Sequence, residues 1–364
     1  MNEREALVLL NAVEGIGPVR LKKILTCCES VQSVFGKTLS ELEAIGIPGQ
    51  IAASVLEAPK RIDVEREFAL ALKEDVQIVT AADAAYPKAL KEIPDAPAVL
   101  YVKGALNPGK ELYIAIVGSR KASRYGLDMA ERFSGELVSY GFTVVSGLAL
   151  GIDAAAHQGA LEAQGRTVAV LGGGLMQLYP LSNVALAQEI AQSGALVSEF
   201  PMRYPALPQN FPRRNRVISG LAMGVLVVEA GEKSGALITA RCAIEQGREV
   251  FALPGRVDSP LSKGTHRLIQ DGAKLVQEIT DIFEELKIPI LHEGASRHPF
   301  ISKSAAALSE EEEVVYEILT ELPKPFDAIV GQTHLSPQKA LSSLVQLEIK
   351  KLVRTYPGNH YARK

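Results

Sequence analysis

Short apolar runs of four or five residues recur along the middle of the chain and alternate with longer stretches of helical periodicity. Several runs are almost wholly apolar, as expected of strands buried on both faces of a sheet. Strands that alternate with helices are joined by right-handed crossovers, so this pattern predicts an α/β fold with a doubly wound parallel sheet. The predicted strands are 114–117, 143–146, 167–171, 195–198, 225–228 and 249–252, and the predicted helices 127–140, 152–163, 184–192 and 236–246.

The texture of the sequence divides the chain into four segments. Residues 1–65 are typical of short helices joined by glycine turns, and residues 66–282 form the predicted α/β core. Residues 283–308 lack periodicity, which predicts a linker. Residues 309–364 are charged and predominantly helical in pattern, which predicts a further small domain.

The N-terminal segment contains a hydrophobic–Gly–hydrophobic–Gly run at 13–17 and a weaker copy at 44–49. This pattern predicts a helix-hairpin-helix turn. Such a turn can hold a DNA phosphate on its backbone N–H groups without reading bases, but it also serves as a plain packing unit. The sequence leaves both interpretations open.

The C-terminal segment has the order of elements of a winged helix. Helices are predicted at 311–321, 326–331 and 336–348, and a basic strand pair follows. Ser336 and Pro337 suit the start of the third helix. Winged helices bind duplex DNA or dock proteins, and both remain possible here. The apolar residues expected to face the core of this domain are Leu341, Leu344, Val345 and Leu347.

Composition limits the classes of partner. The formal net charge is −3, so any nucleic-acid site must be a local basic patch. Cys27, Cys28 and Cys242 cannot form a disulfide framework and have no His at metal-ligand spacing. The sequence has no signal-peptide pattern and no apolar run of membrane-spanning length. We therefore expect a cytoplasmic protein with no membrane partner, no metal and no cofactor.

Glycine-rich loops follow four of the predicted strands. They begin at Gly118, Ser146, Gly172 and Glu229, and all would lie at the carboxyl edge of the sheet, where α/β proteins bind ligands. Glycine lets the backbone approach a phosphate, and helix N-termini supply donors. Tight strand-to-helix turns also need glycine whatever they bind. None of the loops matches a dinucleotide-binding or Walker A pattern.

A basic segment, Phe-Pro-Arg-Arg-Asn-Arg at 211–216, is the second candidate feature. Residues 200–228 contain four arginines and no acid, with Tyr204 and Phe211 interleaved. Arginine can grip phosphates and aromatic rings can stack on bases, which suits a single strand. The alternative is that these arginines are internal partners of Glu199 or Glu229. Asn215 could also cap a helix that begins at Val217.

No catalytic constellation is visible. His157 lies in a helical run with Asp153 four residues before it, and no nucleophile or third ligand is within reach in the sequence. His266 is better explained as a surface or interface residue than as a base. The pattern therefore favours a binding protein rather than an enzyme.

The middle segment resembles the DNA processing protein A family (DprA, also called Smf). The resemblance rests on residues 115–120, 146–157, 211–216, 228–230, 234–240 and 254–255, with a lead-in at 86–104. It implies an extended Rossmann core that binds single-stranded DNA as a homodimer, protects incoming DNA and loads RecA recombinase in natural transformation. Met176 and His266 depart from the usual family pattern. Because Met176 falls in the presumed ligand loop, Gly172–Gly174 are better supported as turn residues than as contacts.

The resemblance and the loops together give two sets of predicted site residues. A twofold interface is expected near the last core strands, at His266, Leu268, Ile269 and Leu275. The main alternative to a DNA-binding protein is a nucleotide-processing enzyme of the lysine-decarboxylase-like group. Enzymes of that group carry a Pro-Gly-Gly-x-Gly-Thr loop, and the corresponding residues 229–235 of this chain lack that pattern. The predicted DNA-binding residues are Gly118, Ser119, Arg120, Ser146, Gly147, Phe211, Arg213, Arg214, Asn215, Arg216, Lys233, Ser234, Gly235 and Thr239.

Overall fold

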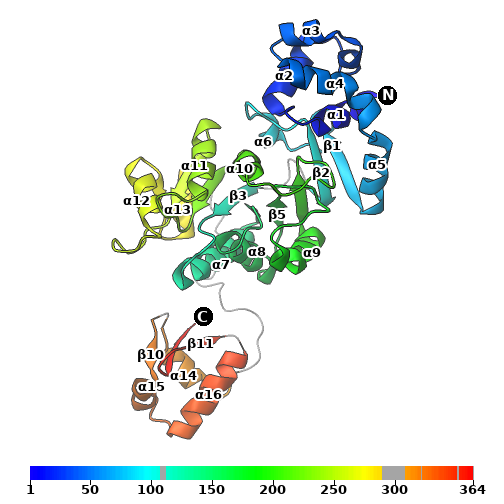
Figure 1. Ribbon diagram of the computed structural model, residues 1–364. Coiled ribbons are helices and arrows are strands. Elements are labelled where there is room, and N and C mark those ends of the chain that lie inside the picture. Colours follow the sequence, from blue (N-terminus) through cyan, green and yellow to red (C-terminus); the bar gives the residue numbers. More distant parts are fainter. Residues whose placement is uncertain (107–111, 289–307, 321, 351, 364) are drawn as a thin grey trace. The chain divides into compact units, whose positions relative to one another are not determined.

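The computed structural model describes residues 1–106, 112–288, 308–320, 322–350 and 352–363. They belong to two compact units, residues 1–290 and residues 291–364 (Figure 1). Most of the predicted linker at 283–308 lies outside the described residues. Within the described part of the chain, no helix has both the length and the apolar character needed to cross a membrane.

A nine-stranded sheet forms the centre of the first unit, in the order β1-β2-β6-β5-β4-β3-β7-β8-β9. The strands from β6 to β9 in that order run parallel, as predicted, whereas β2 pairs antiparallel with β6 and β1 antiparallel with β2. The strands are β1 (Val76–Thr80), β2 (Val99–Gly104), β3 (Leu112–Val117), β4 (Phe142–Ser146), β5 (Thr167–Val170), β6 (Ala195–Ser198), β7 (Gly224–Val227), β8 (Glu249–Ala252) and β9 (Lys274–Leu275).

Helices cover both faces of this sheet because alternate strand residues point to opposite sides. Ile114 and Ile116 of β3 pack against one set of helices, and Ala115 and Val117 against the other. The first set is α7 (Arg124–Ser139), α8 (Ile152–Glu162) and α13 (Ile279–Glu285), and the second includes α10 (Asn210–Leu221) and α11 (Ala236–Glu245). Three further elements of this part are α6 (Lys88–Lys91), α9 (Val184–Ser193) and α12 (Lys263–Gln270).

The sheet has a topological switch point between β3 and β7. From β3 the chain builds outward through β4, β5 and β6, and it then returns through α10 to place β7 on the other side of β3. The loops after β3 and β7 therefore lead to helices on opposite faces of the sheet, α7 and α11. Open α/β sheets bind their ligands at such a point.

The N-terminal helices share a hydrophobic core with one end of the sheet, including Val76, Tyr101 and Leu196. Both predicted hairpins are present, one between α1 and α2 and one between α3 and α4. The predicted division at residue 65 falls inside α5. The helices are α1 (Glu3–Ala12), α2 (Pro18–Cys27), η1 (Gln32–Gly36), α3 (Leu39–Ala44), α4 (Gly49–Arg61) and α5 (Val64–Lys73).

The second unit is a winged helix, as predicted. Ser336 caps α16 by accepting the N–H of Lys339. Leu344 and Leu347 are buried, but the prediction that Leu341 and Val345 also face the core is wrong, since they are 46% and 45% exposed. The elements are α14 (Glu310–Ile318), β10 (Lys324–Pro325), α15 (Phe326–Thr333), α16 (Pro337–Ile349), β11 (Val353–Tyr356) and β12 (His360–Arg363), with sheet order β10-β12-β11.

Candidate nucleic-acid interface

Four loops meet along the carboxyl edge of the parallel strands. Their order across the edge is that of the strands β5, β4, β3 and β7. The loop after β3 carries Arg120, whose side chain is exposed, and the loop after β4 carries the buried Gly147. Because β3 and β7 flank the switch point, Arg120 lies at that point of the carboxyl edge.

An aromatic and cationic cluster surrounds Phe211 near the start of α10. The guanidinium carbon of Arg120 lies 5.1 Å from the centroid of the Phe211 ring, and that of Arg214 lies 5.8 Å away. The ring of Tyr179 approaches the same ring, with centroids 5.9 Å apart. We call Arg120, Tyr179, Phe211 and Arg214 the Phe211 cluster. It combines the two chemistries that hold a single strand, cation and aromatic face.

Arg214 is the buried member of the Phe211 cluster. Its Nη1 donates to the carbonyl oxygens of Gly147, at 2.6 Å, and Val170, at 2.5 Å. Position 147 must be glycine, because a Cβ there would lie 2.3 Å from Nη1 of Arg214. Burial lowers the pKa of the Arg214 guanidinium to about 10, against the opposing pull of Asp153. The side chain therefore stays charged at neutral pH and ties α10 to the ends of β4 and β5.

Two buried titratable groups lie beneath this arginine. Burial raises the pKa of Asp153, and the nearby charge of Arg214 partly offsets that rise. Burial, with a smaller contribution from Arg214, lowers the pKa of His157 to about 3. Its Nδ1 lies 2.7 Å from the Thr167 hydroxyl, which itself donates to the carbonyl of Val144. Nδ1 is therefore the protonated nitrogen, and His157 is a neutral core residue.

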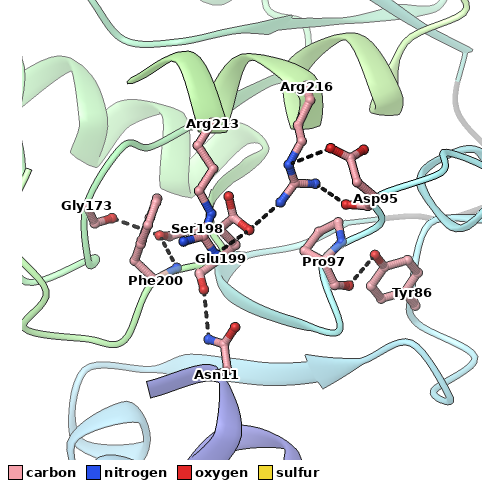
Figure 2. Close-up of polar contacts among 10 residues, drawn as sticks. All are labelled: Asn11, Tyr86, Asp95, Pro97, Gly173, Ser198, Glu199, Phe200, Arg213 and Arg216. Atoms are coloured by element: carbon pink, nitrogen blue, oxygen red, sulfur yellow. Dashed lines mark hydrogen bonds and ion pairs between the residues drawn. The ribbon is translucent and has the colours of Figure 1, made fainter. Parts of the chain in front are cut away.

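A second cluster holds the remaining arginines of the basic segment (Figure 2). Glu199, 3% exposed, directly follows β6, and its Oε2 accepts from Nη2 of both Arg216 and Arg213, the latter at 3.3 Å. Nε of Arg216 lies 3.4 Å from the Asp95 carboxylate, and its Nη1 donates to the Asp95 carbonyl. We call Asp95, Glu199, Arg213 and Arg216 the Glu199 cluster. Its charges pair within the protein, so it is an internal ion-pair network rather than a cationic site for an external anion.

The geometry of α10 explains why one basic segment serves two clusters. Successive residues of an α-helix are about 100° apart, so Arg214 and Arg216 project to nearly opposite sides. The structure therefore does not bring Arg216 to the glycine loops, and the internal pairing with Glu199 applies to it. Asn215 lies inside α10, which begins at Asn210, so the prediction that it caps a helix is wrong.

The other predicted DNA-binding residues differ in accessibility. Lys233 and Gly235 are exposed on the loop after β7, and Ser234 beside them is half-buried. Ser146 is buried, and its hydroxyl donates to the carbonyl of Ile116 at 2.6 Å. Thr239 is also buried, on α11. The predicted interface residues His266, Leu268 and Ile269 lie on α12, and Leu275, 38% exposed, lies on the edge strand β9.

Sequence analysis missed Tyr179. Its side chain is 53% exposed and belongs to the Phe211 cluster. An aromatic residue five positions after a glycine-rich loop is a signal that could have indicated it. Among the described residues there is no group of three His, Cys, Asp or Glu side chains that could hold a metal ion.

Comparison with known families identifies the chain. The sequence profile described as DNA recombination-mediator protein A matches residues 77–287, and that of the DprA winged helix domain matches residues 302–359. The chain belongs to the DNA recombination-mediator protein A family. Among curated relatives of this family, Protein Smf of Escherichia coli (strain K12) is 38% identical over 325 residues, which cover 88% of this chain and 86% of the relative. DNA processing protein DprA of Bacillus subtilis (strain 168) is 40% identical over 252 residues, which cover 68% of this chain and 82% of the relative.

Solved structures of the family share the fold. DNA processing protein A of Streptococcus pneumoniae superposes with a TM-score of 0.68 at 36% identity, over 78% of this chain and 97% of that one. The protein from Helicobacter pylori, studied for its single-stranded DNA binding mode, gives a TM-score of 0.52 at 31% identity. That match covers 58% of this chain and 96% of that one. The predicted family and fold class are confirmed.

Proposed function

We propose that this protein binds single-stranded DNA along the carboxyl edge of its sheet, with the Phe211 cluster as the centre of the site. The observation that carries the proposal is the placement of Arg120, an exposed guanidinium held over an aromatic ring at the topological switch point. No carboxylate within the described part of the chain forms an ion pair with it. A phosphate can therefore take that place, while the exposed ring of Tyr179 offers a face to bases beside Phe211.

Three observations support a single strand as the ligand. Arg120 supplies a local exposed cation on a chain of net charge −3. The site consists of strand-end loops and the first turns of α10, where Phe211 is half-buried and Arg214 is buried, rather than of an exposed recognition helix. A relative from Helicobacter pylori is described for its binding of single-stranded DNA.

The test is a titration with fluorescent oligonucleotides, single-stranded and duplex, at several salt concentrations. We expect the single strand to bind more tightly, independently of sequence, with an affinity that falls steeply with salt. Equal or tighter binding of blunt duplex would refute the proposal. Incubation with nucleoside monophosphates checks the non-enzymatic character that we propose, and release of free base would contradict it.

We further propose that the protein works as a homodimer in the cytoplasm, protects incoming DNA and loads RecA recombinase onto the bound strand during natural transformation. The family description as a recombination mediator supports the RecA step. Strand β9 and α12 are suited to a twofold interface because β9 lies at the sheet edge and Leu275 is partly exposed. Leu275→Arg should give monomers in light scattering, and a folded dimer would exclude this segment. RecA-dependent strand exchange on protein-coated DNA tests loading.

A further inference from the structure

Glu229 is a buried carboxylate at the end of β7 that the proposed strand-binding site does not itself use. It is 4% exposed. The hydrogen-bond partner of its carboxylate is Ser123: the backbone N–H donates to Oε2 at 2.9 Å and the hydroxyl donates to Oε1. Glu229 thus differs from Glu199, which neutralises two arginines.

Ser123 ends the loop that carries Arg120. The same Glu229 also holds the beginning of that loop, because its backbone carbonyl accepts the N–H of Ser119 at 2.8 Å. A single residue of the loop after β7 therefore contacts both ends of the Gly118–Ser123 loop, which follows β3. These contacts bridge the switch point, where the two strands' loops would otherwise diverge.

The carboxylate of Glu229 is closely packed as well as hydrogen-bonded. Gly126 of α7 packs against it, since a Cβ at that position would lie 2.4 Å from Oε2 of Glu229. Ser123 is the N-cap of the 16-residue helix α7, so the negative charge lies at the positive end of a helix dipole. A glutamine could still accept the backbone N–H of Ser123, but its N–H₂ group would have to donate to the Ser123 hydroxyl oxygen, which already accepts from Gly126, so the charge-assisted bond from that hydroxyl is lost.

We propose that Glu229 is a positioning residue for the strand-binding site: it clamps the Gly118–Ser123 loop and thereby holds Arg120 over Phe211. The inference rests on the proposed function, because it assigns Glu229 an effect on DNA through Arg120. Glu229 touches no DNA and belongs to no ion pair among the described contacts.

The sign of the effect distinguishes positioning from simple electrostatics. A buried negative charge near a phosphate site repels DNA, so its removal should strengthen binding if charge alone matters. Loss of the clamp should weaken binding, because Arg120 would have to be ordered when DNA arrives. For Glu229→Gln we expect single-stranded DNA affinity to fall about tenfold. This fall corresponds to part of the free energy of one charge-assisted hydrogen bond being lost from binding.

Glu232→Gln is the matched control. Glu232 lies three residues further along the chain and is exposed, with an ion pair to Lys263 at 3.4 Å. This substitution removes the same charge from the same loop without touching Ser123, so affinity should stay unchanged or rise slightly. Gly126→Ala gives an independent second variant, because its methyl group displaces the carboxylate without changing any charge, and it should weaken binding in the same direction as Glu229→Gln.

A double-mutant cycle on the full chain gives the decisive readout, with fluorescence anisotropy on an oligo(dT) strand and circular dichroism to verify folding. If Glu229 acts through Arg120, Glu229→Gln should change affinity by less than about twofold once Arg120 is alanine. Independent effects that multiply in the double variant would overturn the positioning role. Unchanged or tighter binding by folded Glu229→Gln, or by Gly126→Ala if the former fails to fold, would also overturn it. If one of these results is obtained while the wild type binds single-stranded DNA and Arg120→Ala loses binding, the positioning role is overturned but the proposed function stands. Failure of the wild type to bind, or no effect of Arg120→Ala, would refute both.

Discussion

The Phe211 cluster and the Glu199 cluster both contain arginines of the segment 211–216, Arg214 in the first and Arg213 and Arg216 in the second, yet they differ in exposure and in ion pairing. Arg120 of the Phe211 cluster is exposed, with no ion-pair partner among the described residues. Arg216 of the Glu199 cluster has a side chain only 6% exposed and lies between two carboxylates. The comparison shows that a run of arginines is not by itself a binding site. An arginine can bind an external anion only where the fold supplies no internal one.

The clusters also differ in the segments that they connect. Through Glu199, whose carbonyl accepts from Asn11 of α1 at 2.9 Å, the Glu199 cluster joins α10 to the N-terminal helices and to the segment before β2 (Figure 2). The Phe211 cluster joins α10 to the carboxyl ends of β3, β4 and β5. We therefore assign the first to stability and the second to ligand binding, and the following predictions test that division.

The largest effect is expected from Arg216→Ala. It would break the buried pair with Glu199 and leave that carboxylate only Arg213, whose Nη2 lies 3.3 Å away, and breaking a buried ion pair costs about 3–5 kcal/mol of unfolding free energy. Urea unfolding of the variant measures this. A loss below about 1 kcal/mol, the size typical of an exposed ion pair, would place Arg216 outside the structural network.

Arg120→Ala should show the opposite behaviour. Removal of a charge-assisted phosphate contact should weaken single-stranded DNA binding by about 1.5–3 kcal/mol, and the melting temperature should stay the same because no cavity is left. Anisotropy and thermal unfolding on one sample check both. A lowered melting temperature with unchanged affinity would make Arg120 structural.

The pH dependence of stability tests whether His157 is buried and neutral beneath the Phe211 cluster. Its pKa is about 3 in the folded chain and near 6.5 when unfolded. Between these values only the unfolded chain binds the proton, so stability falls as pH decreases, by about 2 kcal/mol between pH 7 and pH 5. The raised pKa of Asp153 acts in the opposite sense. Comparison with His157→Asn isolates the histidine, and identical pH slopes in the two proteins would show that it is not buried neutral.

Tyr179→Ala should have the smallest effect. Loss of one partly exposed stacking face should weaken binding by about 1 kcal/mol, uniformly over sequences. Tyr140→Ala serves as control, because Tyr140 ends α7 at the opposite edge of the sheet and contacts Phe283. Equal losses of DNA affinity in the two variants would remove Tyr179 from the site.

The apolar pattern of the sequence was sufficient to predict the six central strands, because strands buried on both faces are almost wholly apolar. It could not predict the antiparallel addition of β1 and β2, since the direction of pairing depends on partners elsewhere in the chain. The composition of the basic segment at 211–216 was enough to single it out. The sequence did not show that Arg214 joins one cluster and Arg216 another, because Asp95, a partner of Arg216, lies 121 residues away in sequence. Exposure of Leu341 and Val345 likewise depends on which face of α16 the other helices cover.

The salt dependence of single-stranded DNA binding, measured side by side for wild type, Arg120→Ala and Arg216→Ala, tests the division of labour most directly. Each phosphate contact contributes about 0.7 to the slope of log affinity against log salt concentration. We expect the slope of Arg120→Ala to be smaller by about this amount and that of folded Arg216→Ala to equal the wild type. A reduced slope in Arg216→Ala, with an unchanged slope in Arg120→Ala, would contradict the account.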